Sequence, residues 1–231
     1  MNEISAIRRP RAGRPTREQA QARHAELLDR ALDHFLDKGF EQATIEAIAG
    51  DVGMTKRTVY ARYADKGALF RAAVHRAIER YSIAPERIRA TDVGDLEQTL
   101  TNIAMLRIDL VSSPEGLKLQ RIIQTESYRF PEIFTETYEI GAMPTIKFLA
   151  GLLARETTAG RLAVADPIMA ANAFMSMVVS GPVRFILSGI PLSAGQLRRR
   201  VDYGVRFFLD GALPRPYCPP EITDNPERGS K

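Results

Sequence analysis

The sequence predicts an all-α protein with a small N-terminal helical domain followed by a larger one. Three observations support this fold class. Apolar residues recur at three- and four-residue spacing along most of the chain, prolines and glycines divide it into helix-sized segments, and no segment shows the sustained polar–apolar alternation of a strand. The 231 residues are 45% hydrophobic and 26% charged, which is typical of a globular protein of one or two domains.

About nine helices follow from this pattern. The first begins at Thr16 and ends at Gly39, where a residue with positive φ is expected after a helix. A later helix begins near Asp65 and ends at Ala84-Pro85, since the residue before a proline disfavours helix. The larger second part contains the predicted helices 93–112, 114–129, 131–157, 166–189 and 193–213.

Two short helices between these segments carry the most informative pattern. Thr44 and Thr55 are predicted to cap helices over 44–52 and 55–63, and Gly53 breaks the chain between them. Two short helices joined by a tight glycine-containing turn form a helix-turn-helix, in which the second helix enters the major groove of DNA.

The second of these helices has the composition expected of a recognition helix. Val59 is its clear inward residue, so the helix gains little from core packing. Lysine and arginine donate to guanine or phosphate, and threonine and tyrosine hydroxyls bond phosphates or base edges. The side chains predicted to face outward are Lys56, Arg57, Thr58, Tyr60 and Arg62.

The charge distribution points to the same part of the chain. Residues 1–80 hold 15 Lys/Arg against 11 Asp/Glu, and residues 81–231 hold 17 of each, so the whole net charge of +4 lies in the first third. Six arginines fall within the first 23 residues. A basic arm on a neutral body favours an anionic partner, nucleic acid before membrane; the alternative is a solvated, disordered tail.

The run from His24 to Tyr81 resembles the DNA-binding domain of the TetR family of bacterial transcriptional regulators. The matching landmarks are Phe35, Gly39-Phe40, Thr44-Ile45, Ile48-Ala49, Gly53, Thr55, Val59-Tyr60, Tyr63, Lys66 and Leu69-Phe70. The run departs from the common pattern at Tyr63, where phenylalanine is usual, and at Gly67, where glutamate is common. Segment 114–134 resembles the C-terminal domain of the AefR-like branch of this family.

The resemblance implies a domain organisation and a set of DNA contacts. It implies a DNA-binding domain over 17–84 and a helical effector-binding and dimerisation domain over 85–213. Prolines without a periodic apolar pattern predict a flexible basic arm over 1–16 and an irregular tail over 214–231. The residues implied to contact DNA are Arg14, Thr44, Thr55, Lys56, Arg57, Thr58, Tyr60, Tyr63 and Lys66.

Family members carry a C-terminal domain that binds a small molecule and forms a homodimer. Candidate residues of an effector pocket are Met105, Leu106, Ile122, Ile123, Glu126, Tyr128, Phe134, Tyr138, Phe148 and Phe174, and Pro144 is expected to kink the 131–157 helix and open space. Two apolar stripes near the chain end predict a four-helix dimer interface, with the alternative that they are intrachain core. The candidate dimer residues are Met177, Val178, Gly181, Phe185, Leu197, Val201, Val205 and Phe208.

Several functional classes are not expected. Cys218 is the single cysteine, the three histidines are scattered, and no nucleotide-binding or hydrolase motif occurs, so we expect no metal, no cofactor and no enzymatic activity. No membrane span and no apolar leader after the first Met are expected, which favours the cytoplasm. The resemblance implies a bacterial protein associated with the nucleoid.

The sequence therefore predicts a homodimeric transcriptional regulator, a repressor that a small, partly apolar effector releases from a palindromic operator. Two alternatives stay open at this point. One is an architectural protein that binds DNA without regard to sequence, and the other is a helical small-molecule-binding protein or enzyme.

Overall fold

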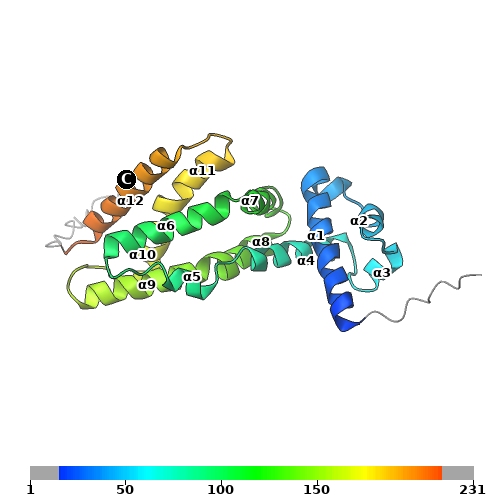
Figure 1. The fold of residues 1–231 in the computed structure, drawn as a ribbon, viewed down its shortest axis with the longest axis horizontal. Helices are drawn as coiled ribbons and strands as arrows, with labels where there is room; N and C mark the ends of the chain where they lie inside the picture. Colours follow the sequence, from blue (N-terminus) through cyan, green and yellow to red (C-terminus); the bar gives the residue numbers. More distant parts are fainter. Residues whose placement is uncertain (1–15, 215–231) are drawn as a thin grey trace, which may run out of the picture. The chain divides into compact units, whose positions relative to one another are not determined.

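The structure, a computed structural model, describes residues 16–214 (Figure 1). Every regular element in this range is helical, which confirms the all-α prediction. By their contacts the described residues form two compact units, 16–84 with 109–144 and 85–108 with 145–214. These units divide the chain differently from the expected domains, because 109–144 packs with the N-terminal helices.

The first unit contains six helices and one π turn. Its N-terminal part comprises α1 (Arg17–Gln42), α2 (Ile45–Asp51), α3 (Lys56–Tyr60) and α4 (Lys66–Arg80). Its second part comprises α7 (Pro114–Glu126), α8 (Pro131–Glu136) and the π turn η1 (Thr137–Ala142). Among these helices, α4 packs against α1, α7 and α8, so it lies at the centre of the unit.

The predicted helix starts of this unit are confirmed. The side chains of Thr44, Thr55 and Asp65 each accept a hydrogen bond from the backbone N–H three residues later. Gly39 and Gly53 adopt φ of 76° and 62°, a region that glycine tolerates without steric cost. The α3 helix is shorter than predicted, because its last residue is Tyr60 and the chain continues as a turn.

Four phenylalanines form the centre of this unit's core. Phe70 of α4 is fully buried, and its ring centroid lies 4.9 Å from those of Phe35 and Phe130 and 5.2 Å from that of Phe40. Edge-on aromatic contacts at these distances add to the free energy gained by burial. Because Phe130 immediately precedes α8, this aromatic cluster (Phe35, Phe40, Phe70 and Phe130) joins 109–144 to the N-terminal helices.

The second unit is also helical. It contains α5 (Pro85–Arg89), most of α6 (Leu96–Ser112), α9 (Met143–Thr158), α10 (Pro167–Phe174), the π turn η2 (Met175–Ser180), α11 (Gly181–Leu187) and α12 (Ala194–Ala212). In this unit η2 packs against α10, α11 and α12. The short helix α5 is additional to the predicted segments. The π turns join α8 to α9 and α10 to α11, so the long segments predicted at 131–157 and 166–189 are continuous but locally wider helices.

One helix of the second unit has the length and composition of a membrane span. Within the described residues, the helix Pro167–Leu187 is long and apolar enough to cross a membrane by length and composition, with a mean hydropathy of 1.3. A single helix of this kind is weak evidence for a span, because core helices pass the same test. Here Phe174 and Val178 of this segment are buried in the second unit, where Phe174 contacts Phe208 of α12.

The aromatic cluster yields a stability prediction. Phe70→Ala should lower the free energy of unfolding by about 3–5 kcal/mol, because it removes a fully buried ring from the contacts between α1, α4 and α8. Phe134→Ala is the matched control, since this ring is 62% exposed and its loss should change stability by less than about 0.5 kcal/mol. Urea unfolding followed by circular dichroism measures both. Equal losses in the two variants would contradict the central role of Phe70.

Candidate nucleic-acid interface

The turn between α2 and α3 fixes the direction of α3. The N–H of Met54 donates to the carbonyl of Ala49 at 2.8 Å, and the N–H of Gly53 donates to that of Gly50 at 3.1 Å. Val59 is the buried residue of α3, while Ile48 and Ala49 of α2 are buried in the same core. A five-residue helix held by one apolar side chain and a tight turn leaves the remainder of its surface for another contact.

The structure brings four of the predicted DNA-binding residues together on α3. Lys56, Arg57, Thr58 and Tyr60 are all exposed, and the Tyr60 side chain is 43% exposed. Thr55 organises the start of the helix, since its hydroxyl accepts from the N–H of Thr58 at 3.2 Å and lies 2.9 Å from the Thr58 hydroxyl. The exposed side of α3 therefore presents two cations and several hydroxyls.

Lys56 has a partner that the sequence analysis missed. Its ammonium forms an ion pair with the carboxylate of Glu46 on α2 and lies 5.6 Å from the centre of the Tyr60 ring. The hydrogen bond between the two side chains holds the pKa of Glu46 below and that of Lys56 above their ordinary values. Opposite charges ten residues apart, at the starts of two short helices joined by a turn, could have suggested this pair.

Tyr63, which is predicted to contact DNA, is half-buried after α3, whereas the predicted residues on α3 are exposed. Its hydroxyl lies 2.5 Å from Nε2 of His24, and the two rings stack with their planes 9° apart. Burial raises the pKa of Tyr63, and one hydrogen bond joins its hydroxyl to the imidazole of His24. This contact links α1 to the turn after α3, which is a structural role.

Lys66 is also used inside the protein. Its ammonium donates to the carbonyls of Glu41 at 2.9 Å and Ala43 at 3.1 Å, and it lies 4.7 Å from the centre of the Phe40 ring. Two of its three N–H donors therefore hold the end of α1, and the predicted phosphate contact of Lys66 stays a prediction. Thr44 is exposed at the start of α2, whereas Arg14 lies outside the described residues.

The predicted effector-pocket residues differ in their exposure and are divided between the two units. Tyr128 is fully exposed, Phe134 is 62% exposed, and Ile122 and Ile123 are buried in the core of the first unit. Glu126 and Tyr138 also belong to the first unit, and Met105, Leu106, Phe148 and Phe174 to the second. Ile122 and Ile123 therefore belong to a packed core, and helical periodicity alone does not distinguish such residues from the lining of a cavity.

The predicted dimer residues fall into two groups. Val178, Val201 and Val205 are at most 1% exposed, and a Cβ added at Gly204 would lie 3.2 Å from Cγ2 of Val178. These valines therefore fill the contact between η2 and α12 within the chain, which is the intrachain-core alternative stated for the two apolar stripes. The half-buried Leu197 and Phe208 also belong to α12, and Phe208 packs against Phe174 at 5.2 Å.

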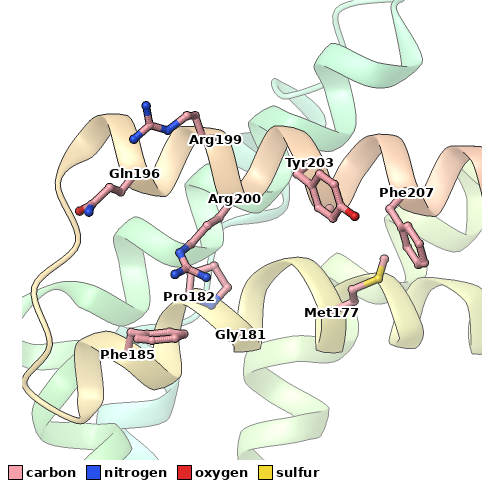
Figure 2. A pocket seen from close by; sticks show the side chains of 10 residues that line it. Met177, Gly181, Pro182, Phe185, Gln196, Arg199, Arg200, Tyr203 and Phe207 are labelled. Atoms are coloured by element: carbon pink, nitrogen blue, oxygen red, sulfur yellow. The ribbon is translucent and has the colours of Figure 1, made fainter.

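The remaining three, Met177, Gly181 and Phe185, line an open groove of about 480 Å³ (Figure 2). Its other wall contains Tyr203 and Phe207 of α12, which are 73% and 61% exposed and which the sequence analysis missed. These aromatics stand four residues apart on one helical face, a spacing that could have identified them. Figure 2 shows Arg200 pointing across the groove toward Phe185, with its guanidinium 4.6 Å from the ring centre.

Comparisons with known proteins agree with this geometry. Residues 27–73 match the sequence model of the bacterial regulatory proteins of the tetR family, and residues 98–211 match that of the C-terminal domain of AefR-like transcriptional repressors. The chain belongs to the TetR family. The two matches together span well over half of its length and confirm both resemblances stated from the sequence.

Several relatives share the architecture. A putative TetR-family regulator from Mesorhizobium loti has a TM-score of 0.70 and 25% identity, covering 87% of this chain and all of that one. The flavonoid-responsive regulator FrrA has a TM-score of 0.68 and 28% identity, covering 84% and 99%. The uncharacterized HTH-type transcriptional regulator YdeS of Bacillus subtilis is 28% identical over 111 residues, which span 48% of this chain and about half of that protein.

This TetR-family protein is thus a helix-turn-helix transcriptional regulator, as the sequence predicted. Regulators of the family bind operator DNA, form dimers, respond to small-molecule effectors and are soluble cytoplasmic proteins. Within the part of the chain that the structure covers, no group of three or more His, Cys, Asp or Glu side chains is placed to hold a metal ion.

The contact between His24 and Tyr63 predicts a pH dependence of stability. Burial lowers the pKa of His24 below its usual 6.5, and Arg62 and Arg76 lower it further. In the window below about 6.5 the unfolded chain binds a proton that the folded protein does not. The free energy of unfolding should therefore be unaffected above this window and decrease as the pH falls through it.

Urea unfolding of the wild type and His24→Gln at several pH values measures this effect. The variant should lose part of the decrease, because glutamine has no proton to bind. The same dependence on pH in both proteins would contradict the assignment to His24.

Proposed function

We propose that this protein is a transcriptional repressor that binds a palindromic operator as a homodimer and leaves it when a small, partly apolar effector binds. The observation that carries the proposal is the exposed side of α3, where Lys56, Arg57, Thr58 and Tyr60 surround a single buried valine. Thr44 and Thr55 at the starts of α2 and α3 are proposed to contact phosphates. The arm at 1–16, with Arg14, is proposed to bind the adjacent groove.

The C-terminal part supports the regulatory half of the proposal. Its sequence matches a domain described as that of AefR-like transcriptional repressors, and the similar FrrA is described as flavonoid-responsive. We expect an effector of comparable character, bound within 85–213, and we expect neither a cofactor nor enzymatic activity. The protein would act in the bacterial cytoplasm on the nucleoid.

Exposed apolar side chains on η2 and α12 support dimer formation. Met177, Tyr203 and Phe207 are 39%, 73% and 61% exposed, and Met169 on α10 is 66% exposed. A continuous apolar surface on two neighbouring helices is typical of an interface. A two-fold dimer would place two recognition helices about one turn of DNA, roughly 34–36 Å, apart.

Selection of genomic fragments by the purified protein, followed by footprinting, tests the proposal. Recovery of one palindromic sequence with two protected half-sites would support it. Recovery of DNA without sequence preference would favour an architectural protein instead, and no recovery would favour a helical small-molecule-binding protein or enzyme.

Arg57→Ala should weaken operator binding by about 1–3 kcal/mol and relax specificity at one base position per half-site, because arginine donates to guanine O6 and N7. Arg87→Ala removes the same charge from the exposed surface of α5 and should leave binding unchanged. Fluorescence anisotropy with the operator and with single-position variants of it measures both. Unchanged discrimination by Arg57→Ala would contradict its role in reading a base.

Phe207→Asp should weaken the dimer by about 30-fold or more, because it places a charge in the centre of an apolar contact. Operator affinity should fall with it. Phe134→Asp introduces the same change at an aromatic residue of α8 with nearly the same exposure, 62%, and should leave the dimer intact. Sedimentation equilibrium measures the dissociation constants, and dimers of equal strength would show that the groove at Phe207 is not the interface.

A further inference from the structure

The ion pair between Glu46 and Lys56 is an unusual feature for a surface that binds DNA. Glu46 lies in the first turn of α2 and Lys56 is the first residue of α3, so the pair bridges the two helices of the motif. Their side chains are 57% and 51% exposed, and Lys56 also lies against the Tyr60 ring at 5.6 Å. The pair therefore stands at the surface that the proposed function assigns to DNA.

A carboxylate at this position opposes binding to DNA in general. When Lys56 moves to a phosphate, Glu46 loses its partner and faces a polyanion. When Lys56 keeps its partner, its charge contributes little to the electrostatic attraction that dominates sequence-independent binding. In both cases the pair weakens contacts with the phosphate backbone, so its presence needs another explanation.

The major-groove edge of a G·C pair offers one. Guanine presents two acceptors, N7 and O6, and cytosine presents the N4 amino donor beside them. A lysine donates to the guanine acceptors, and a glutamate accepts from cytosine N4. An adjacent ammonium and carboxylate thus match this edge without separating from each other. Only a G·C pair places two adjacent acceptors beside the donor, so the ammonium can donate to both N7 and O6 while the carboxylate accepts from N4; in an A·T pair the donor lies between two single acceptors.

On this basis we infer that Lys56 and Glu46 together read one G·C base pair in each operator half-site, with Lys56 on the guanine and Glu46 on the cytosine. The inference rests on the proposed function and adds a specificity-determining residue, Glu46, on the helix that precedes the recognition helix. Against other sequences the carboxylate acts as a repulsive element, which raises specificity at the expense of affinity.

The test uses the full-length protein and the operator found by footprinting, with each base pair replaced in turn. The wild type should lose about 5- to 150-fold in affinity when the G·C pair read by Lys56 and Glu46 is replaced. Glu46→Gln should shift the preference at that position from cytosine to adenine, because glutamine bonds adenine N6 and N7. Lys56→Gln should relax the same position, and the double variant should lose less than the sum of the two.

Glu86→Gln is the matched control, since it removes the same charge from an exposed residue of α5 that is ion-paired with Arg89. It should leave the preference at every position unchanged. Circular dichroism and thermal unfolding should be the same for all variants, because both side chains of the pair are half exposed.

Two results would overturn the inference while the proposed function stands. In one, Glu46→Gln binds every sequence more tightly by the same factor and with a steeper salt dependence, so the carboxylate acts by charge alone. In the other, the variants at Glu46 and Lys56 relax different positions. A wild-type protein that selects no sequence would instead overturn the proposed function itself, and the inference with it.

Discussion

The contact of Phe70 with Phe35, Phe40 and Phe130 is the constraint on which the N-terminal unit depends. Helix α4 has no other aromatic side chain in the core, and the Phe70 ring is in contact with rings from α1 and from the segment before α8. The helix-turn-helix packs on the same core through Ile45, Ile48 and Val59. A displacement of Phe130 would therefore reach the recognition helix through packed side chains, because close-packed interiors transmit strain.

Two cations cover the exposed edge of this cluster. The guanidinium of Arg129 lies 4.5 Å and the ammonium of Lys66 4.7 Å from the centre of the Phe40 ring. Arg129 is also ion-paired with Glu41, and Lys66 donates to backbone carbonyls at the end of α1. The positive charge near α1 is thus partly used to hold the unit together, and the net charge of the first 80 residues overstates what is offered to DNA.

The local features of the fold could be predicted from the sequence, because they depend on neighbouring residues. The caps at Thr44, Thr55 and Asp65 and the positive φ of Gly53 each follow from one or two side chains. The hydrogen-bond partners of Tyr63 and Lys66 could not be predicted, since they lie 39 and at least 23 residues away in the sequence. A donor that looks available in the sequence is available only when the fold leaves it unpaired.

Helical periodicity was least informative where both faces of a helix are apolar. Along Pro167–Leu187, Phe174 and Val178 are buried in the chain's own core, whereas Met169 and Met177 are exposed. The π turn η2 adds to the difficulty, because its wider i→i+5 spacing shifts the residues after it relative to an α-helical stripe. A helix that packs on α12 on one side and has an apolar surface on the other needs high overall hydropathy, which explains why its composition also fits a membrane span. In this segment the high hydropathy reflects two apolar surfaces. One packs within the chain, and the other is proposed to pack against a second copy of the protein.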